Sequence, residues 1–381
     1  MMNRKVELLI QSEIRNMSIE CDRIGGINLS QGISKFPIAE PIQERVGRAV
    51  AEGKNHYTRY DGIFPLREAI ADKYREQGIV CDPEKNVIVS AGATGAFYCA
   101  CMALLNPGDE VIIFEPYYGY HINTLWAVHA VPVYVRLSPP EWSFTLEQLE
   151  RVVTEKTKAI MINTPANPSG KVFSKDELTA LGYFCKKHRL WVFTDEIYEY
   201  FLYDDNQHII PASLPEFSGK TITISGYSKT FSTTGWRVGY AVVPEELHYI
   251  IGYINDLIYV CAPSPLQYGI AEGMKTLPLA FYQILAQRFE KKRDLLCSTL
   301  SEIGLEPSIP QGAYYVLSNV EKIPGRTSKE KAMFILNETK VATVPGMAFY
   351  HDDGGENLAR FCFAQEDDIL EQACKLLLKR K

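Results

Sequence analysis

The sequence feature that most constrains the fold is an alternation of short β-branched segments with helical segments between residues 85 and 243. One intervening segment, 174–188, opens on Ser174 with Glu177 three residues later, the pattern of a helix-capping box. Strand–helix alternation predicts an α/β layer whose sheet is mostly parallel, because parallel strands need long crossover connections. The expected strands are 87–89, 111–114, 131–135, 160–163, 191–194, 221–224 and 238–243.

Outside this block the pattern changes. Residues 278–305 and 365–380 have the spacing of long amphipathic helices, and 312–317 has the composition of a strand. These segments predict a smaller α+β domain towards the C-terminal end. The N-terminal ~30 residues are expected to pack on one of the two domains, and no internal repeat or Gly/Ser linker is found.

Composition and charge exclude several classes of protein. With 46% hydrophobic and 23% charged residues among 381, the chain is too apolar to be disordered. A formal net charge of −6 argues against broad binding to nucleic acid, which needs a basic surface. The longest apolar run, 96–105, is far shorter than the ~20 residues that span a bilayer. Residues 1–16 do not resemble a secretory signal, so we expect a cytoplasmic protein without a membrane partner.

The nine cysteines form no recognisable disulfide or metal framework. Their number is odd, and no pair has C-x-x-C spacing. Free, buried thiols in a reducing compartment are the favoured interpretation, with catalytic or metal-binding thiols as the alternative. We expect no metal site.

Small and rigid residues follow two of the expected strands. Strand 87–89 leads into Ser-Ala-Gly-Ala-Thr-Gly at 90–95, whose open backbone N–H groups at a helix start would suit an anion such as phosphate. A plain tight turn explains this segment equally well. Strand 160–163 leads into Asn-Thr-Pro-Ala-Asn-Pro-Ser-Gly, in which rigid turns would hold an asparagine side chain in place, although an ordinary loop is also possible.

Ionisable groups follow two further strands. Asp195, with Tyr198 nearby, closes an apolar strand, so its carboxylate needs a cationic or hydrogen-bonding partner unless it only caps a helix. Lys229 follows strand 221–224 and is a candidate amine nucleophile, whereas alone it could be a solvated loop lysine. Arg237, eight residues later, offers a planar donor fork suited to phosphate.

The set of groups is more informative than any one of them. The carboxyl ends of parallel strands meet at one edge of a sheet, where ligands bind. An anion-binding turn, an asparagine, an Asp–Tyr pair and a lysine with an arginine are together what pyridoxal phosphate requires.

With these motifs, from Leu29-Ser30-Gln31-Gly32 to Arg360-Phe361-Cys362-Phe363, the sequence resembles the class I (class I/II) aminotransferases of the fold-type-I pyridoxal-phosphate-dependent enzymes. The resemblance implies a large domain with a mostly parallel seven-stranded sheet, here 36–255. It implies a small α+β domain built from both chain ends, here 1–35 and 256–381. A homodimer with composite active sites is also implied.

The resemblance assigns roles residue by residue. Lys229 matches the Schiff-base lysine, whose freed amine moves the proton between the substrate Cα and the cofactor C4′. Asp195 matches the acid that keeps the pyridine nitrogen protonated. Tyr198 and Asn167 match the pair that hydrogen-bonds the phenolic oxygen of the cofactor, and Tyr118 matches the aromatic residue that stacks on its ring.

The remaining matches concern anion binding. The phosphate group would be held by the backbone of Ala93 and Thr94, by Ser228 and Arg237, and by Tyr57 reaching across the dimer interface. Arg360 matches the arginine that binds the substrate α-carboxylate, with Gly32 as a backbone contact beside it. Gly226 departs from the family, since many members have a serine there, and Ser225 or Ser228 could replace its phosphate contact.

The function implied is transfer of an amino group from an L-amino acid to a 2-oxo acid by a ping-pong mechanism. Overall resemblance favours aromatic, kynurenine-like or methionine-like donors. A β-eliminating C–S lyase on the same fold is the main alternative. A non-catalytic pyridoxal-phosphate-binding regulatory protein is the other.

Overall fold

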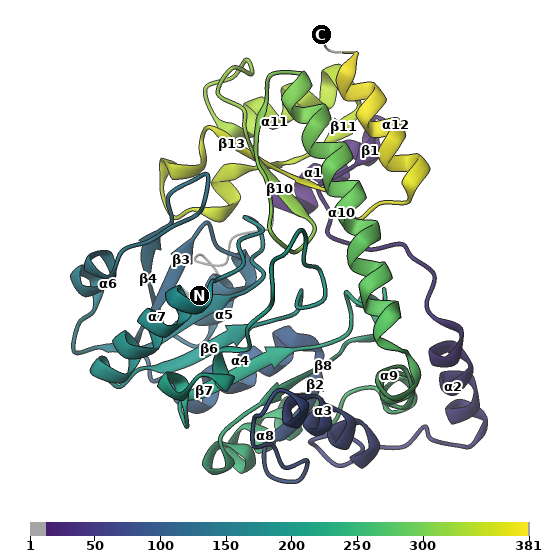
Figure 1. Ribbon diagram of the computed structural model, residues 1–381, viewed down its shortest axis with the longest axis vertical. Coiled ribbons are helices and arrows are strands. Elements are labelled where there is room, and N and C mark those ends of the chain that lie inside the picture. Colours follow the sequence, from purple (N-terminus) through teal and green to yellow (C-terminus); the bar gives the residue numbers. More distant parts are fainter. Residues whose placement is uncertain (1–12, 380–381) are drawn as a thin grey trace, which may run out of the picture.

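The computed structural model describes residues 13–379, and the seven expected strands form one sheet (Figure 1). Its order is β2-β8-β7-β6-β5-β3-β4, with β8 antiparallel to both neighbours and the other pairs parallel. The predicted α/β layer with a mostly parallel seven-stranded sheet is therefore confirmed. The strands are β2 (Val87–Ala91), β3 (Glu110–Glu115), β4 (Val131–Arg136), β5 (Thr157–Asn163), β6 (Trp191–Asp195), β7 (Thr221–Ser225) and β8 (Val238–Val242).

Helices cover both faces of this sheet, as the strand pattern shows. In β3, Val111 and Ile113 pack in one buried cluster with Leu125 of α5, whereas the alternate residue Ile112 packs in another with Leu181 of α7. Helix α7 opens with the capping box predicted from the sequence. The helices of this layer are α2 (Glu40–Ala51), α3 (Phe64–Glu76), α4 (Gly92–Leu104), α5 (Gly119–Ala127), α6 (Leu146–Val152), α7 (Lys175–His188), α8 (Glu245–Tyr259) and α9 (Ser264–Thr276).

A second, four-stranded antiparallel sheet has the order β12-β13-β10-β9. It comprises β9 (Glu306–Ser308), β10 (Tyr315–Asn319), β12 (Val344–Pro345) and β13 (Leu358–Cys362), with helices α10 (Leu279–Glu302), α11 (Ser328–Thr339) and α12 (Asp367–Leu378). Helices α10 and α12 confirm the two predicted long helices. The strand expected at 312–317 begins later, because Ala313 has a φ of +59° and turns the chain before the ladder starts.

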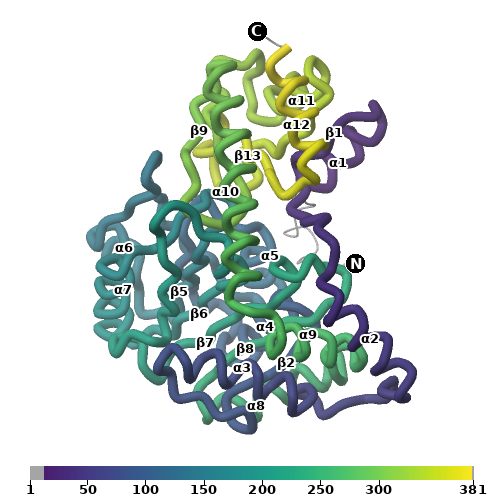
Figure 2. The backbone as a smooth tube through the Cα atoms, turned by 45° about the vertical axis from the view of Figure 1, so that its right-hand side comes forward, coloured from purple at the N-terminus to yellow at the C-terminus, as the bar shows by residue number. Residues whose placement is uncertain are grey.

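The N-terminal part joins this smaller region. Helix α1 (Glu13–Arg23) is followed by β1 (Ile27–Asn28), which pairs in parallel with β11 (Val341–Ala342). Figure 2 shows α1 and β1 beside α11 and α12, with the chain then descending to α2. Residues 1–12, part of the expected small-domain segment and of the segment judged not to be a secretory signal, lie outside the described residues.

The packing of α9 bears on the expected division of the chain at residue 256. Ile270 and Ala271 of α9 lie in the same buried cluster as Val87 and Val89 of β2. Helix α9 thus packs with the large sheet. We propose that the boundary lies near the start of α10, at about residue 279, and in this amended form the division stays a prediction.

All nine cysteines lie within the described residues and are free; eight are buried and Cys261 is partly exposed. Burial raises the pKa of the Cys99 and Cys185 thiols to about 12, which keeps them protonated. Over residues 13–379 no helix combines the length and the apolar character that crossing a bilayer requires.

Candidate active site

A cavity of about 350 Å³ lies at the carboxyl edge of the large sheet, where the sequence predicted a site. Nine of the expected residues line it: Ala93, Thr94, Tyr118, Asn167, Asp195, Tyr198, Ser228, Lys229 and Arg237. Gly32 and Arg360 do not line the cavity itself but hydrogen-bond to lining residues, Lys229 and Asn167 respectively. Tyr57 lies elsewhere.

Lys229 is buried in this cavity after β7. Its Nζ donates a hydrogen bond to Gly32 O at 3.3 Å. The pKa of Lys229 is lowered from 10.5 to about 8, chiefly by burial; nearby Arg237 and Arg360 also lower it, whereas Cys362 and Asp195 raise it. A larger fraction of the amine is therefore neutral near pH 8 than for an exposed lysine, as a nucleophile or general base requires.

This pKa gives a first prediction. Competitive acetylation of the cofactor-free protein, read by peptide mass spectrometry, should show the reactivity of Lys229 rising with pH around a midpoint near 8 rather than 10.5. The sign follows because burial penalises the ammonium form, and only the neutral amine is acylated. Lys291, exposed on α10, serves as the reference in the same sample. A Lys229 midpoint above 10 would contradict the burial argument.

Asp195 ends β6 and its carboxylate is held by two neighbours. Its Oδ1 accepts a hydrogen bond from the backbone N–H of Ile197 at 3.3 Å, and its Oδ2 lies 2.9 Å from His121 Nε2. Sequence reasoning missed His121, which lies within α5 and not directly at the end of a strand. The three-residue spacing from Tyr118 was the available signal, since the two rings meet edge to face at 5.3 Å.

Two further tyrosines that sequence reasoning missed contact residues of the site without lining the cavity themselves. The hydroxyl of Tyr198 lies 2.9 Å from that of Tyr315, and Tyr314 donates to Gly32 O at 3.0 Å. Burial raises the pKa of Tyr198 well above its ordinary value, so the phenol is neutral. The Tyr-Tyr pair in segment 312–317 could have indicated them, but that segment was interpreted only as a strand.

Arg360 of β13 is only 1% exposed and has no carboxylate partner among residues 13–379. Its Nη1 donates to Asn167 Oδ1 at 2.8 Å and its Nη2 to Ser30 O at 2.6 Å, while Nε has no partner there. Its guanidinium lies 4.2 Å from the centre of the Tyr315 ring. A buried guanidinium with a spare donor suits an anionic ligand, most directly a carboxylate.

Two glycines let Arg237 and the backbone of β8 approach the start of α4. Gly92 has a φ of +75°, and a Cβ added to it would lie 2.5 Å from Arg237 Nη2. A Cβ added to Gly239 would overlap the backbone N of Ala93. The helix N-terminus, the guanidinium and the Ser228 side chain thus surround a concave end of the cavity that suits a phosphate group.

Ser225 and Ser228 differ in what they face. The Ser225 hydroxyl lies 3.1 Å from Glu199 Oε1 and 3.3 Å from Glu196 O, and Ser225 does not line the cavity. Ser228 does line it. Of the two residues expected to replace the contact missing at Gly226, the geometry therefore favours Ser228.

Tyr57 is 83% exposed and borders a separate surface depression. Within one chain it does not reach the cavity. Its expected contact with the phosphate of a partner subunit stays a prediction.

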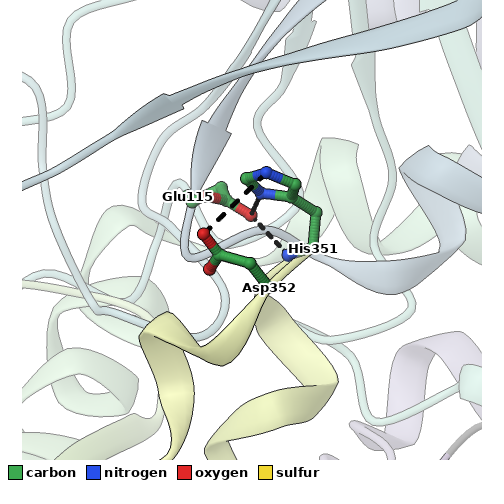
Figure 3. A group of neighbouring side chains, drawn as sticks. All are labelled: Glu115, His351 and Asp352. Atoms are coloured by element: carbon green, nitrogen blue, oxygen red, sulfur yellow. Dashed lines mark hydrogen bonds and ion pairs between the residues drawn. The ribbon is translucent and has the colours of Figure 1, made fainter.

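Glu115, His351 and Asp352 turn toward one another near the site (Figure 3). His351 Nδ1 lies 2.9 Å from Glu115 Oε1. Arg136 Nη2 lies 2.5 Å from Asp352 Oδ1 and 3.4 Å from Glu115 Oε2, so a guanidinium already balances the two carboxylates. The cluster links β3 and β4 to the loop that follows β12.

Comparison with known proteins agrees with this geometry. Residues 24–377 match the family described as aminotransferase class I and II, and the chain therefore belongs to that family. Its members are in general dependent on pyridoxal phosphate.

Individual similar proteins have different named substrates. The aspartate aminotransferase of Pyrococcus abyssi is 35% identical, over 98% of this chain and 96% of its own. The rat kynurenine–oxoglutarate transaminase 3 is 32% identical, over 91% and 83% respectively. The structure of N-succinyldiaminopimelate aminotransferase from Mycobacterium tuberculosis superposes with a TM-score of 0.96 and 31% identity, over 100% of both chains.

Proposed function

We propose that this protein is a pyridoxal-phosphate-dependent aminotransferase that moves an amino group from an L-amino acid to a 2-oxo acid by a ping-pong mechanism. The observation that carries the proposal is the buried Lys229 amine, with its pKa lowered to about 8, in a cavity that also contains Asp195 and Arg237. These three groups are a nucleophilic amine, an acid and an anion-binding cation.

The residues present fit the cofactor. The part of the cavity lined by Ala93, Thr94, Ser228 and Arg237 would hold its phosphate, because Gly92 and Gly239 let the Arg237 guanidinium and the β8 backbone come close to the start of α4 there. Asp195 would bind the pyridine nitrogen, Tyr118 its ring face, and Tyr198 with Asn167 its phenolic oxygen. When bound, pyridoxal phosphate supplies an electron sink for the α-carbon of the substrate.

The protein groups supply binding and proton transfer. Arg360 binds the α-carboxylate of the amino acid, which Gly32 approaches through its backbone. The amine of Lys229 would take the proton from the substrate Cα and deliver it to the C4′ position of the cofactor, and would move a proton in the opposite direction in the second half-reaction. His121 Nε2 lies 2.9 Å from Asp195 Oδ2, and this contact keeps the carboxylate in position without the help of water.

A donor panel tests the proposal. The protein loaded with pyridoxal phosphate should convert at least one L-amino acid with 2-oxoglutarate or pyruvate, with parallel double-reciprocal plots as the two substrates are varied. Ammonia and pyruvate formed from cystathionine without any acceptor would instead identify a β-eliminating C–S lyase. An absorption spectrum that no amino acid changes would identify a non-catalytic binding protein.

The surface of α8 supports a homodimer. Tyr249, Tyr253 and Leu257 expose 66%, 56% and 81% of their surface along one face of this helix. The loop that carries Tyr57 lies against the same helix, since Asn255 Nδ2 donates to Tyr60 O at 2.7 Å. We propose that a second copy covers this face and that Tyr57 enters the site of the partner subunit.

A charge on this face is expected to separate the subunits. Leu257→Asp should give monomers by size-exclusion chromatography with light scattering, and should lower aminotransferase activity at least about tenfold because the composite site is lost. Tyr183→Asp, at an exposed position on α7, is the matched control and should leave the dimer intact. A fully dimeric, fully active Leu257→Asp variant would exclude α8 from the interface.

The free thiols bear on location. None of the nine cysteines forms a disulfide. We propose on this basis that the protein functions in the cytoplasm, where thiols stay reduced.

A further inference from the structure

A second cavity of about 340 Å³ lies beside the candidate active site. Tyr118 and Tyr120 line both cavities, so the two share a wall. Its other walls come from α1, from α5 and from the loop that follows β12, which brings the two chain ends and the large sheet together at one place.

Aromatic rings form much of this cavity. Trp126, Phe349 and Tyr350 line it together with Tyr118 and Tyr120. The guanidinium of Arg360 lies 5.1 Å from the centre of the Phe349 ring. An amino acid whose α-carboxylate is bound by Arg360 therefore has its side chain within reach of these rings.

Apart from the imidazole of His351, the charged groups that line the cavity are acidic. Glu13, Asp352, Asp353 and Glu356 line it, and no lysine or arginine of the described chain does so. Partners outside the lining offset part of this charge: Arg136 pairs with Asp352 and Lys329 pairs with Glu13. This composition favours a positive or N–H-donating group near aromatic faces, and disfavours a carboxylate.

Glu13 places a carboxylate at the wall of this cavity. Its Oε1 lies 3.1 Å from Lys329 Nζ and 3.3 Å from Asn16 Nδ2. Its Oε2 is buried and has no hydrogen-bond partner among residues 13–379. Because Glu13 lines the cavity, its negative charge favours a cationic or hydrogen-bond-donating group of a ligand placed there.

We propose that this aromatic, acidic cavity receives the side chain of the amino donor. The preferred donors are then L-amino acids with an apolar or aromatic stem that ends in a cationic or N–H-donating nitrogen, placed beside the Glu13 carboxylate. Donors with a side-chain carboxylate are disfavoured. This inference rests on the proposed aminotransferase function and narrows its substrate class. It is drawn from the residues that line the cavity and not from the names of similar proteins.

Matched donor pairs test the inference. L-arginine against L-citrulline isolates the positive charge, and L-4-aminophenylalanine against L-phenylalanine isolates the nitrogen donor. We expect kcat/KM to favour the first member of at least one pair by about tenfold or more, and to favour both first members over L-glutamate. The pair that shows the preference identifies which nitrogen is recognised. Ratios within twofold for both pairs would overturn the inference.

A variant assigns the preference to Glu13. In the donor pair that shows the preference, Glu13→Gln should reduce the ratio of the two kcat/KM values at least about fivefold, because the amide keeps the size of the side chain but loses its charge. Glu20→Gln, on the same helix but paired with Arg23 at the surface, should keep the wild-type ratio. An unchanged ratio in Glu13→Gln would overturn the role of this carboxylate.

Binding separates this inference from the proposed function. Calorimetric titration of Lys229→Ala, which cannot complete transfer, with the same donor pairs should show the same preference. If Lys229→Ala binds the first members preferentially but the wild-type protein transaminates none of the donors, the proposed aminotransferase function is refuted and the cavity assignment is retained. If the wild-type protein transaminates L-alanine or L-methionine but neither kcat/KM nor calorimetric binding shows a preference within the donor pairs, the aminotransferase function is supported and the cavity assignment is refuted.

Discussion

Replacing Lys229 by alanine is expected to lower kcat for transamination by at least about 10³-fold, while some cofactor remains bound. General-base proton transfer contributes about 10²–10⁴-fold in enzymes, and the same amine also forms the bond to the cofactor. Single-turnover absorbance measurements with excess amino acid would give the rate of the first half-reaction. Lys229→Arg should be equally impaired, because it restores the positive charge without a neutral amine.

Three results would bear on this assignment. Borohydride reduction of the wild-type protein should leave the cofactor label on the peptide that contains Lys229 and nowhere else. Lys291→Ala, at an exposed position on α10, should retain wild-type turnover. Turnover near the wild-type level in Lys229→Ala would refute the role of this residue.

Replacing Arg360 by lysine or methionine is expected to lower kcat/KM for amino donors by about 10²–10⁴-fold. Hydrogen bonds to charged groups contribute about 1.5–3 kcal/mol each, and a carboxylate bound by a guanidinium accepts two of them. The loss should be larger for methionine, which removes the charge, than for lysine, which removes only the planar fork.

A donor without the carboxylate separates this effect from a loss of folding. Wild-type protein should strongly prefer L-phenylalanine to phenylethylamine, and both Arg360 variants should lose most of that preference. Arg326→Met, at an exposed position before α11, is the control for removal of an arginine. Thermal unfolding should be recorded for each variant, since Asn167 and Ser30 lose a donor when Arg360 is replaced. Arg360→Lys with kcat/KM within threefold of wild type would contradict carboxylate binding.

Local sequence pattern predicted the large sheet because most of its strands are buried on both faces and bounded by turn residues. It also placed Asp195 and Lys229 together, since both follow strands that end at one edge of a parallel sheet. In the structure, β6 and β7 are neighbours, and both residues line one cavity. The geometry of parallel strands was therefore sufficient for this part of the site.

Contacts between distant parts of the chain could not be predicted from local sequence pattern. Gly32 meets Lys229 across 197 residues, and Arg360 lies on a different sheet from the cavity. Only family resemblance pointed to either of them. His121 was missed because its role depends on the turn of α5 toward Asp195. The packing of α9 could not be predicted either, because the spacing of an amphipathic helix is the same whichever domain it packs against.

The burial of eight thiols leaves Cys261 as a native attachment point for a spectroscopic probe. It lies directly after α8, and its Sγ accepts a hydrogen bond from the backbone of Thr58, the residue that follows Tyr57. A small fluorophore coupled there by maleimide chemistry would sit at the edge of the face that we assign to subunit contact. Its anisotropy or energy transfer between copies would follow assembly in real time without any engineered cysteine.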